Sequence, residues 1–159
     1  MSSQIDSALT RTVSGVRRGA LAQLSSLYRS ELAATQTYTV ALYHESLAFY
    51  GSVLRRQRRV HEERLAALGE RFIDLGEKAP DSSGAWGTFV RLIEDVAAGL
   101  TPEMALAVLA EEEETLANDY VGSLELLDTL SSNLVAERLL PGQNVTVRVI
   151  RRTHERSAL

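Results

Sequence analysis

The chain of 159 residues contains no cysteine. This absence excludes disulfides, thiol catalysis and zinc or iron–sulfur sites built on cysteine. No apolar run approaches the length of a membrane span, and no long apolar stretch follows the first residues as it would in a secretory signal. We therefore expect a cytoplasmic protein that has no membrane partner.

Proline and glycine are also scarce, with 3 and 10 residues respectively. Only the stretch NVTVRVI at 144–150 alternates as a strand would, and it runs into a helical pattern. Leucine, alanine, glutamate and arginine dominate, which favours helices. The net charge of −4 predicts no broad attraction to nucleic acid. The length suits one domain with its own apolar core.

Apolar residues recur at helical spacing in four long segments and one short one. The clearest helix start is Thr101 as N-cap, followed by Pro102 in the first turn. We predict an all-α, up-down-up-down four-helix bundle, with a short extra helix at 85–99 in the connection between the second and third long helices. The long helices are expected at 18–43, 47–75, 102–130 and from 145 to beyond 154, with a break near 44–46 where Ser46 is a candidate N-cap.

Residues 1–17 are expected to form an N-terminal arm, and residues 18–159 a single domain. Ile5, Leu9, Val13 and Val16 fall at helical spacing, which is compatible with an amphipathic helix. A frayed or partner-docked arm fits the same segment equally well.

An internal repeat relates the first and third predicted helices. The residues Leu24, Leu27, Glu31, Tyr38 and Leu42 match Leu106, Leu109, Glu113, Tyr120 and Leu124 in type and spacing. The glutamate and the tyrosine one heptad later carry most of this information, because leucine is common on any apolar helix face. The second and fourth helices are matched through RRVHE at 58–62 and RRTHE at 151–155. The chain is thus predicted to contain two similar hairpins, with a longer connection inside the second.

Each of the four helices carries one polar residue among its apolar positions: Glu31, His61, Glu113 and His154. A buried charge or imidazole is costly unless it is paired or bound to metal. Two glutamates and two histidines on facing helices are suitable ligands for a metal ion. The alternative is that they are boundary residues whose side chains reach solvent.

A di-iron bundle requires Glu-x-x-His on two of its helices. Here Arg58 and Arg151 stand three residues before the histidines, so the expected charge is reversed and a standard di-iron site is disfavoured. Two interpretations remain. In the favoured one, both arginines turn inward and pair with Glu31 and Glu113 in a metal-free core. In the other, one divalent ion (iron, zinc or manganese) binds the two glutamates together with His61 and His154.

Four stretches together resemble a bacterial ferritin-like family of unknown function. They are LSSLYRSELAATQTY (24–38), HEERLAALGERFIDLGEKAP (61–80), AWGTFVRLIEDVAAGL (85–100) and AVLAEEEETLANDYVGSLELL (107–127). The resemblance covers about 21–127, with a weaker match in THER at 153–156. Where the family often has Gly-Glu-Asp, this chain has Glu112-Glu113-Glu114, so only the middle residue matches. The resemblance implies a ferritin-like four-helix bundle, often dimeric, and implies no particular activity.

The favoured hypothesis is therefore a non-catalytic bundle with a degenerate di-metal site that acts through oligomerisation, a homodimer first, or through a protein partner. A competing hypothesis is a metal-binding stress-response or metal-storage protein that uses the glutamate and histidine residues of the core. A third is a helical adaptor that acts through its N-terminal arm.

Overall fold

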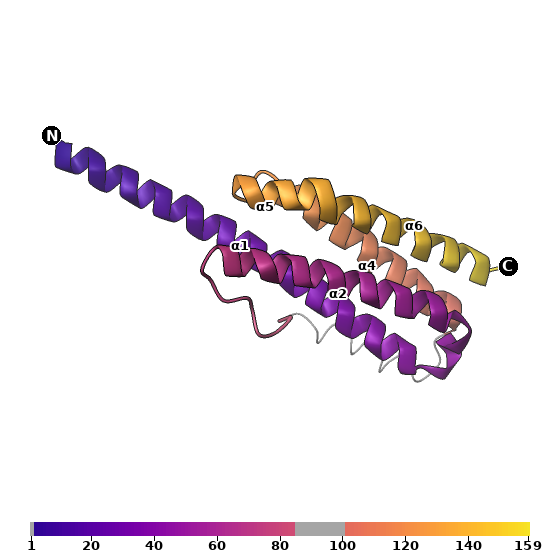
Figure 1. Cartoon of the computed structure of the whole chain (residues 1–159). Helices are drawn as coiled ribbons and strands as arrows, with labels where there is room; N and C mark the ends of the chain where they lie inside the picture. The colour runs from indigo at the N-terminus through magenta and orange to yellow at the C-terminus, as the bar shows by residue number, and fades with distance from the viewer. Residues whose placement is uncertain (1, 85–100) are drawn as a thin grey trace.

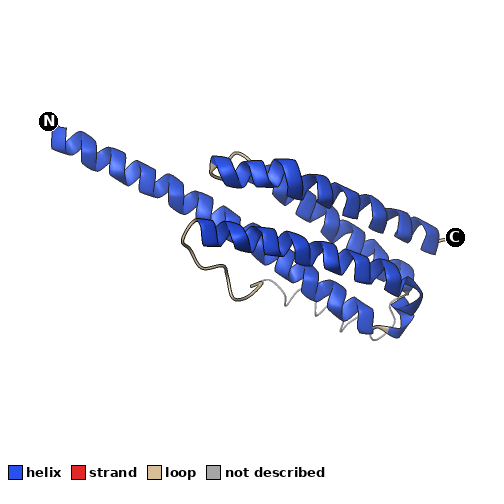
Figure 2. Ribbon diagram, viewed as in Figure 1, coloured by secondary structure: helices blue, strands red, loops and turns tan. Residues whose placement is uncertain are grey.

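The computed structural model of the chain describes residues 2–84 and 101–159. Within these residues the protein is entirely helical, without strands (Figure 2), so the predicted all-α class with four long helices is confirmed. The long helices are α1 (Ser2–Tyr43), α2 (Gly51–Asp74), α4 (Pro102–Ser123) and α6 (Leu140–Ser157). No helix in the described residues is long and apolar enough to cross a membrane. The helix predicted at 85–99 lies outside the described residues.

The first hairpin consists of α1 and α2, joined by the 3-10 helix η1 (Glu45–Tyr50). The predicted break at 44–46 is confirmed, but Ser46 is not the N-cap: His44 occupies that position and its Nδ1 lies 2.7 Å from the Ser46 hydroxyl. The 3-10 turns delay the start of α2 from the predicted residue 47 to Gly51. At the other end, α1 continues without a break through residue 17, and its N-terminal part projects beyond the bundle (Figure 1).

The second hairpin departs most from prediction. Helix α4 ends at Ser123, and a new helix begins at once after Asp128, whose carboxylate caps it by accepting the backbone N–H groups of Leu130 and Ser131. The helix then runs through α5 (Thr129–Leu134) and a π turn, η2 (Val135–Leu139), into α6. The predicted connection around LLPGQN is therefore wrong. Pro141 is tolerated because it lies in the first turn of α6, directly after the π turn.

The order of helix directions is up-down-down-up, so the predicted up-down-up-down order is wrong. Two hydrogen bonds, from Tyr38 to Glu113 and from Tyr120 to Glu31, require α1 and α4 to run antiparallel. Since α2 is also antiparallel to α1, α2 and α4 run in the same direction (Figure 1). The segment between Asp74 and Pro102 is long enough to return along the bundle, which the sequence pattern did not reveal.

Two apolar clusters fill the interior. One contains mainly residues from the arm end of the bundle, including Leu24, Leu68, Phe72 and Leu116. The other lies towards η1 and includes Leu47, Leu54, Leu106, Leu109 and Ile150. The buried polar residues described below come from the helix positions between these clusters, so their interactions are strengthened by a low local dielectric.

Candidate functional site

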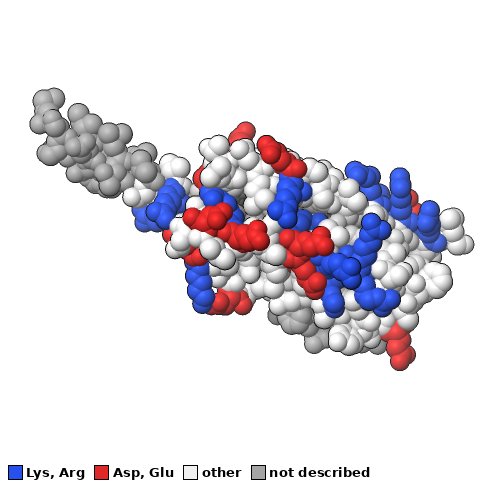
Figure 3. Space-filling model, viewed as in Figure 1, with Lys and Arg blue, Asp and Glu red and all other residues white. Residues whose placement is uncertain are grey.

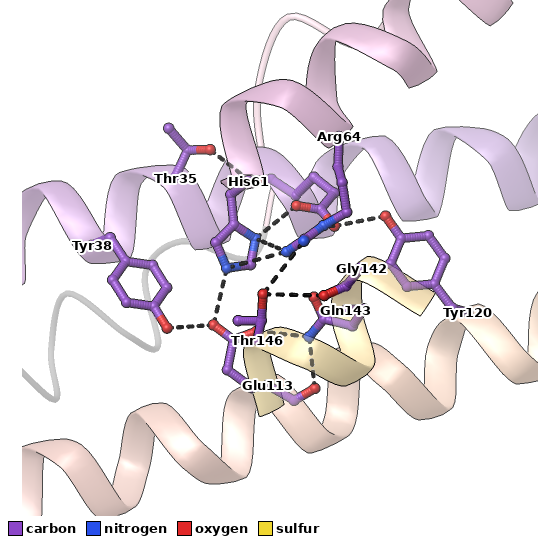
Figure 4. Close-up of polar contacts among 10 residues, drawn as sticks. Thr35, Tyr38, His61, Arg64, Glu113, Tyr120, Gly142, Gln143 and Thr146 are labelled. Carbon is purple, nitrogen blue, oxygen red and sulfur yellow. Dashed lines mark hydrogen bonds and ion pairs between the residues drawn. The ribbon is translucent and has the colours of Figure 1, made fainter. Parts of the chain in front are cut away.

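A buried polar layer crosses the middle of the bundle, and all four long helices contribute to it (Figure 4). Its members are buried side chains that hydrogen-bond to one another: Glu31 and Tyr38 of α1, His61 and Arg64 of α2, Glu113 and Tyr120 of α4, and Gln143 and Thr146 of α6. Within each helix the two residues are three or seven positions apart, a spacing that places both on the face that also carries the core leucines.

The carboxylate of Glu31 accepts three hydrogen bonds. Its Oε2 lies 2.7 Å from His61 Nδ1, and its Oε1 accepts from Arg64 Nε at 2.7 Å and from the Tyr120 hydroxyl at 2.6 Å. Burial alone would raise the pKa of Glu31, but the charges and hydrogen bonds of His61 and Arg64 outweigh burial and lower this pKa below its ordinary value. Glu31 is therefore an ionised carboxylate in the core.

Glu113 is satisfied in a similar way. Its Oε1 lies 2.9 Å from His61 Nε2 and accepts the Tyr38 hydroxyl at 2.5 Å, while its Oε2 accepts Gln143 Nε2 at 2.6 Å. Burial opposes ionisation here too, yet His61 and these hydrogen bonds lower the pKa of Glu113 below its ordinary value. Every oxygen of both carboxylates thus accepts at least one hydrogen bond from a protein donor.

His61 joins the two carboxylates, one at each ring nitrogen, and its ring stacks on Tyr38 with a centroid distance of 5.2 Å. Because both neighbours are ionised carboxylates, both nitrogens donate, and the ring is an imidazolium. Burial by itself lowers the pKa of His61, but the charges of Glu113 and Glu31 raise it to about 9. The ring is therefore positively charged at neutral pH.

Arg64 supplies the second positive charge, and sequence reasoning missed it. Its Nε donates to Glu31, its Nη1 lies 3.4 Å from the Thr146 hydroxyl, and its Nη2 lies 2.9 Å from His61 Nδ1. Because the ring is protonated, the contact between Arg64 Nη2 and His61 Nδ1 joins two donors and is not a hydrogen bond. The guanidinium and the imidazolium lie side by side because both donate to the Glu31 carboxylate. Two carboxylates and two cations make the layer electrically neutral. One signal was available in the sequence, because Arg64 follows His61 at the helical spacing of the apolar face.

The residue equivalent to His61 in the second hairpin is Gln143. Glu31 and His61 are 30 residues apart, and so are Glu113 and Gln143. The same offset makes Thr146 the equivalent of Arg64, and these two residues, 82 positions apart, contact each other across the bundle. The predicted match between His61 and His154 is therefore wrong. That match rested on the similar composition of the two segments. It also required a longer connection inside the second hairpin, and the equal offsets of 30 residues show that no such extra length separates the equivalent residues.

The structure brings together three of the four predicted metal ligands: Glu31, His61 and Glu113. His154 is only partly buried and lies about 12 Å further along α6 than Thr146. Within the described residues, no hydrogen bond or ion pair links its side chain to the polar layer.

The predicted inward pairing of Arg58 and Arg151 is also wrong. Arg58 pairs with Glu62 one turn along α2, at 3.2 Å, and Arg151 pairs with Glu114 on α4. All four side chains are substantially exposed. The physical reason is helical phase, since the buried cation position on α2 is the one three residues after His61.

The residues that could hold a metal are Glu31, Glu113 and His61, and their arrangement does not fit one. The carboxylate oxygens are directed at protein donors, and neither ring nitrogen of His61 is free. Within residues 14–84 and 101–159, no three acidic, histidine or cysteine side chains are grouped as a metal site requires. A divalent ion would have to displace the Arg64 guanidinium and deprotonate His61.

A cleft of about 630 Å³ lies between α1 and α4, and Tyr38 and Glu113 are among the residues that line it. Its lining also includes the acidic residues Glu112 and Asp119, whose pKa values are raised, chiefly by burial. The cleft thus places an acidic lining next to the buried layer.

Neither a protein-family model, nor a curated protein, nor a solved structure matches this chain.

Proposed function

We propose that this protein is a ferritin-like four-helix bundle in which a charge-neutral hydrogen-bonded core has replaced the di-metal site, and that it is a non-catalytic scaffold acting through assembly with itself or with a protein partner. The observation that carries the proposal is the occupation of all four carboxylate oxygens of Glu31 and Glu113 by protein donors, two of them cationic.

The spacing of the polar layer supports a di-metal origin. The template needs one glutamate from each of two helices and Glu-x-x-His from each of the other two. Glu31 and Glu113 fit the first requirement. His61-x-x-Arg64 and Gln143-x-x-Thr146 have the spacing of the second, with all four ligands exchanged. The single long connection, between α2 and α4, also agrees with ferritin-like topology.

The exchanged residues also explain how such a core is stable without metal. A di-metal site balances its carboxylates with divalent ions, whereas here the imidazolium of His61 and the guanidinium of Arg64 balance Glu31 and Glu113. Leaving either carboxylate unpaired would cost several kcal/mol, because an unpaired buried charge is poorly solvated. The polar layer is thus a structural core that holds four helices in one register.

A second candidate function, metal binding in stress response or metal storage, is favoured by one observation. Glu31, His61 and Glu113 converge from three helices, and each carboxylate lies within hydrogen-bond distance of the imidazole. This candidate requires His61 to lose its proton and Arg64 to move away from Glu31.

The test is titration of the protein with Co²⁺, read from its visible absorption and from elemental analysis. The wild type is expected to bind no stoichiometric metal. The variant H61E/R64H/Q143E/T146H, which restores the template, is expected to bind about two ions per chain. The matched control is R58E/R151E, which places glutamate three residues before each histidine and is expected to bind none. Stoichiometric cobalt in the wild type, lost in His61→Ala, would instead support the second candidate.

A further inference from the structure

We propose that a second copy of this chain docks on the outer face of α2 and that the two copies are related by a two-fold axis. The two α2 helices then run antiparallel, so that the basic half of each faces the acidic half of the other. This inference refines the assembly part of the proposed function and rests on it, and its evidence comes from the outer surface of α2.

The outer face of α2 carries a stripe of exposed residues at helical spacing: Arg55, Arg59, Glu63, Ala66, Glu70 and Asp74. Its first half is basic and its second half acidic. Figure 3 shows this division, with arginines over the η1 end of the face and acidic side chains over the other half of α2. Arg148, Arg152 and Arg156 of α6 are exposed as well.

The charges on this stripe have almost no partners within the chain. Among the described residues, Arg55, Arg59, Glu63 and Glu70 form no ion pair, and Asp74 makes only a 3.7 Å contact with Arg71. This differs from the neighbouring Arg58, which pairs with Glu62. The stripe thus presents charges of both signs that are available to another molecule.

The positions of the charges match a two-fold axis. In an antiparallel pair of α2 helices centred at the level between Arg64 and Leu65, Arg55 lies opposite Asp74 and Arg59 lies opposite Glu70. A two-fold axis makes each of these pairs twice, because the same patch is used on both subunits. Near the axis, Glu63 lies opposite the small side chain of Ala66, so four of the five charges of the stripe face a charge of opposite sign.

An exposed apolar residue beside the stripe fits the same register. Ile73 is 76% exposed at the end of α2, and it lies opposite Arg56 of a second copy. The aliphatic part of an arginine side chain can cover such a residue while its charge stays in water. At 24 residues, α2 is about 36 Å long, so the paired charges are spread over most of the helix.

A nucleic acid or another uniform polyanion fits this face less well. A polymer lying on the arginines would continue along α2 over Glu63, Glu70 and Asp74 and would be repelled there. A second copy presents both signs in the required order.

Sedimentation velocity and light scattering at low and high salt test the proposal. The wild type is expected to be a dimer that dissociates as salt rises. The variants R55E/R59E and E70R/D74R have stripes of one sign, and we expect each to weaken self-association on the order of 100-fold or more. Mixed together, they are expected to form a heterodimer. The matched control, R18E/R29E, makes the same charge change on α1 and should remain dimeric.

A monomeric wild type, or a mixture of the two variants that stays monomeric, would overturn the proposal, provided that circular dichroism shows each protein folded. Heparin binding by a monomeric wild type that is lost in R55E/R59E would assign the arginines to a polyanion. The metal content of each variant is measured in parallel. Because these substitutions do not touch the polar layer, failure of the dimer and failure of the metal-free core give different results.

Discussion

The two hairpins share the same arrangement of hydrogen bonds in the core, but they carry different residue types at equivalent positions. In both, a glutamate from the first helix accepts a tyrosine hydroxyl from the other hairpin and a nitrogen donor 30 residues further along its own hairpin. In the first hairpin that donor is His61, followed by Arg64. In the second it is Gln143, followed by Thr146.

The difference shows that all the positive charge of the core resides in one hairpin. The α1–α2 hairpin neutralises its own Glu31 and also Glu113 of the other, through the two nitrogens of His61. Apart from Glu113 itself, the α4–α6 hairpin contributes only neutral side chains to the layer, and Gln143 Oε1 is buried without a donor among the described residues. Charge balance therefore ties the hairpins together, and substitutions at equivalent sites should have unequal effects.

The largest difference in the loss of unfolding free energy is expected between Arg64→Met and the substitution at the equivalent position, Thr146→Val. Removing the guanidinium leaves the buried Glu31 with one cation shared between two carboxylates, which should cost about 3–5 kcal/mol of unfolding free energy. Thr146→Val removes two long hydrogen bonds, one accepted from Arg64 and one donated to the backbone carbonyl of Gly142, and should cost about 1 kcal/mol. Urea unfolding followed by circular dichroism measures both, and equal losses would show that the charge is not concentrated in the first hairpin.

The next largest effect is a pH dependence that belongs to His61. Its folded-state pKa is raised to about 9, so its stabilisation is complete below the unfolded pKa and is lost as pH rises through the folded value. We expect stability to fall by roughly 3 kcal/mol between about pH 6.5 and 9.

The urea midpoint as a function of pH measures this loss, and His61→Gln is the control because it makes the first hairpin resemble the second. The variant should be less stable at neutral pH and nearly flat over the same interval. At acid pH the direction reverses, because Glu31 and Glu113 have lowered pKa values and their contribution is lost as pH falls. If His61→Gln still lost stability as pH rises over this interval, a titrating group other than His61 would be responsible.

A smaller effect is expected for Gln143→Leu, the position equivalent to His61. The change removes two hydrogen bonds from Nε2, to the side chain and to the backbone carbonyl of Glu113, and should cost about 1–3 kcal/mol. It removes no charge and also deletes the unpaired Oε1. The same unfolding measurement should place it well below Arg64→Met, and a cost as large as that of Arg64→Met would contradict the asymmetry.

The smallest effects are expected for the two tyrosines, and they test whether the two hairpins are equivalent at these positions. Tyr38→Phe and Tyr120→Phe each remove one hydroxyl that donates to a buried carboxylate of the other hairpin. Each should cost on the order of 1–2 kcal/mol, and the two costs should agree closely. A double-mutant cycle adds their coupling, and a large difference between the single variants would mean that the tyrosines are not equivalent.

The repeat of α1 in α4 could be predicted because its glutamate and tyrosine are uncommon on an apolar helix face. Glu31, Glu113 and His61 were predicted as buried polar residues for the same reason, and the structure buries all three. The equivalence of α2 and α6 could not be predicted, because Gln143 and Thr146 share no residue type with His61 and Arg64. The arginines around His154 supplied a false match.

Other errors have local causes. Pro141 and Gly142 were taken as a connection, although the helix runs through them after a π turn. The direction of α4 depends on how the chain crosses between Asp74 and Pro102, and helical periodicity carries no information about it. Arg64 was missed because arginine on a core face is usually read as a boundary residue.

The protonation state of His61 tests most directly whether two side-chain cations stand in place of metal. Nitrogen-15 NMR of the ring, recorded against pH in the presence and absence of Zn²⁺, reports it without any substitution. We predict two protonated nitrogens at neutral pH, titration near pH 9, and no change on adding zinc. A neutral ring at pH 7, with one nitrogen shifted by stoichiometric zinc, would contradict the metal-free core.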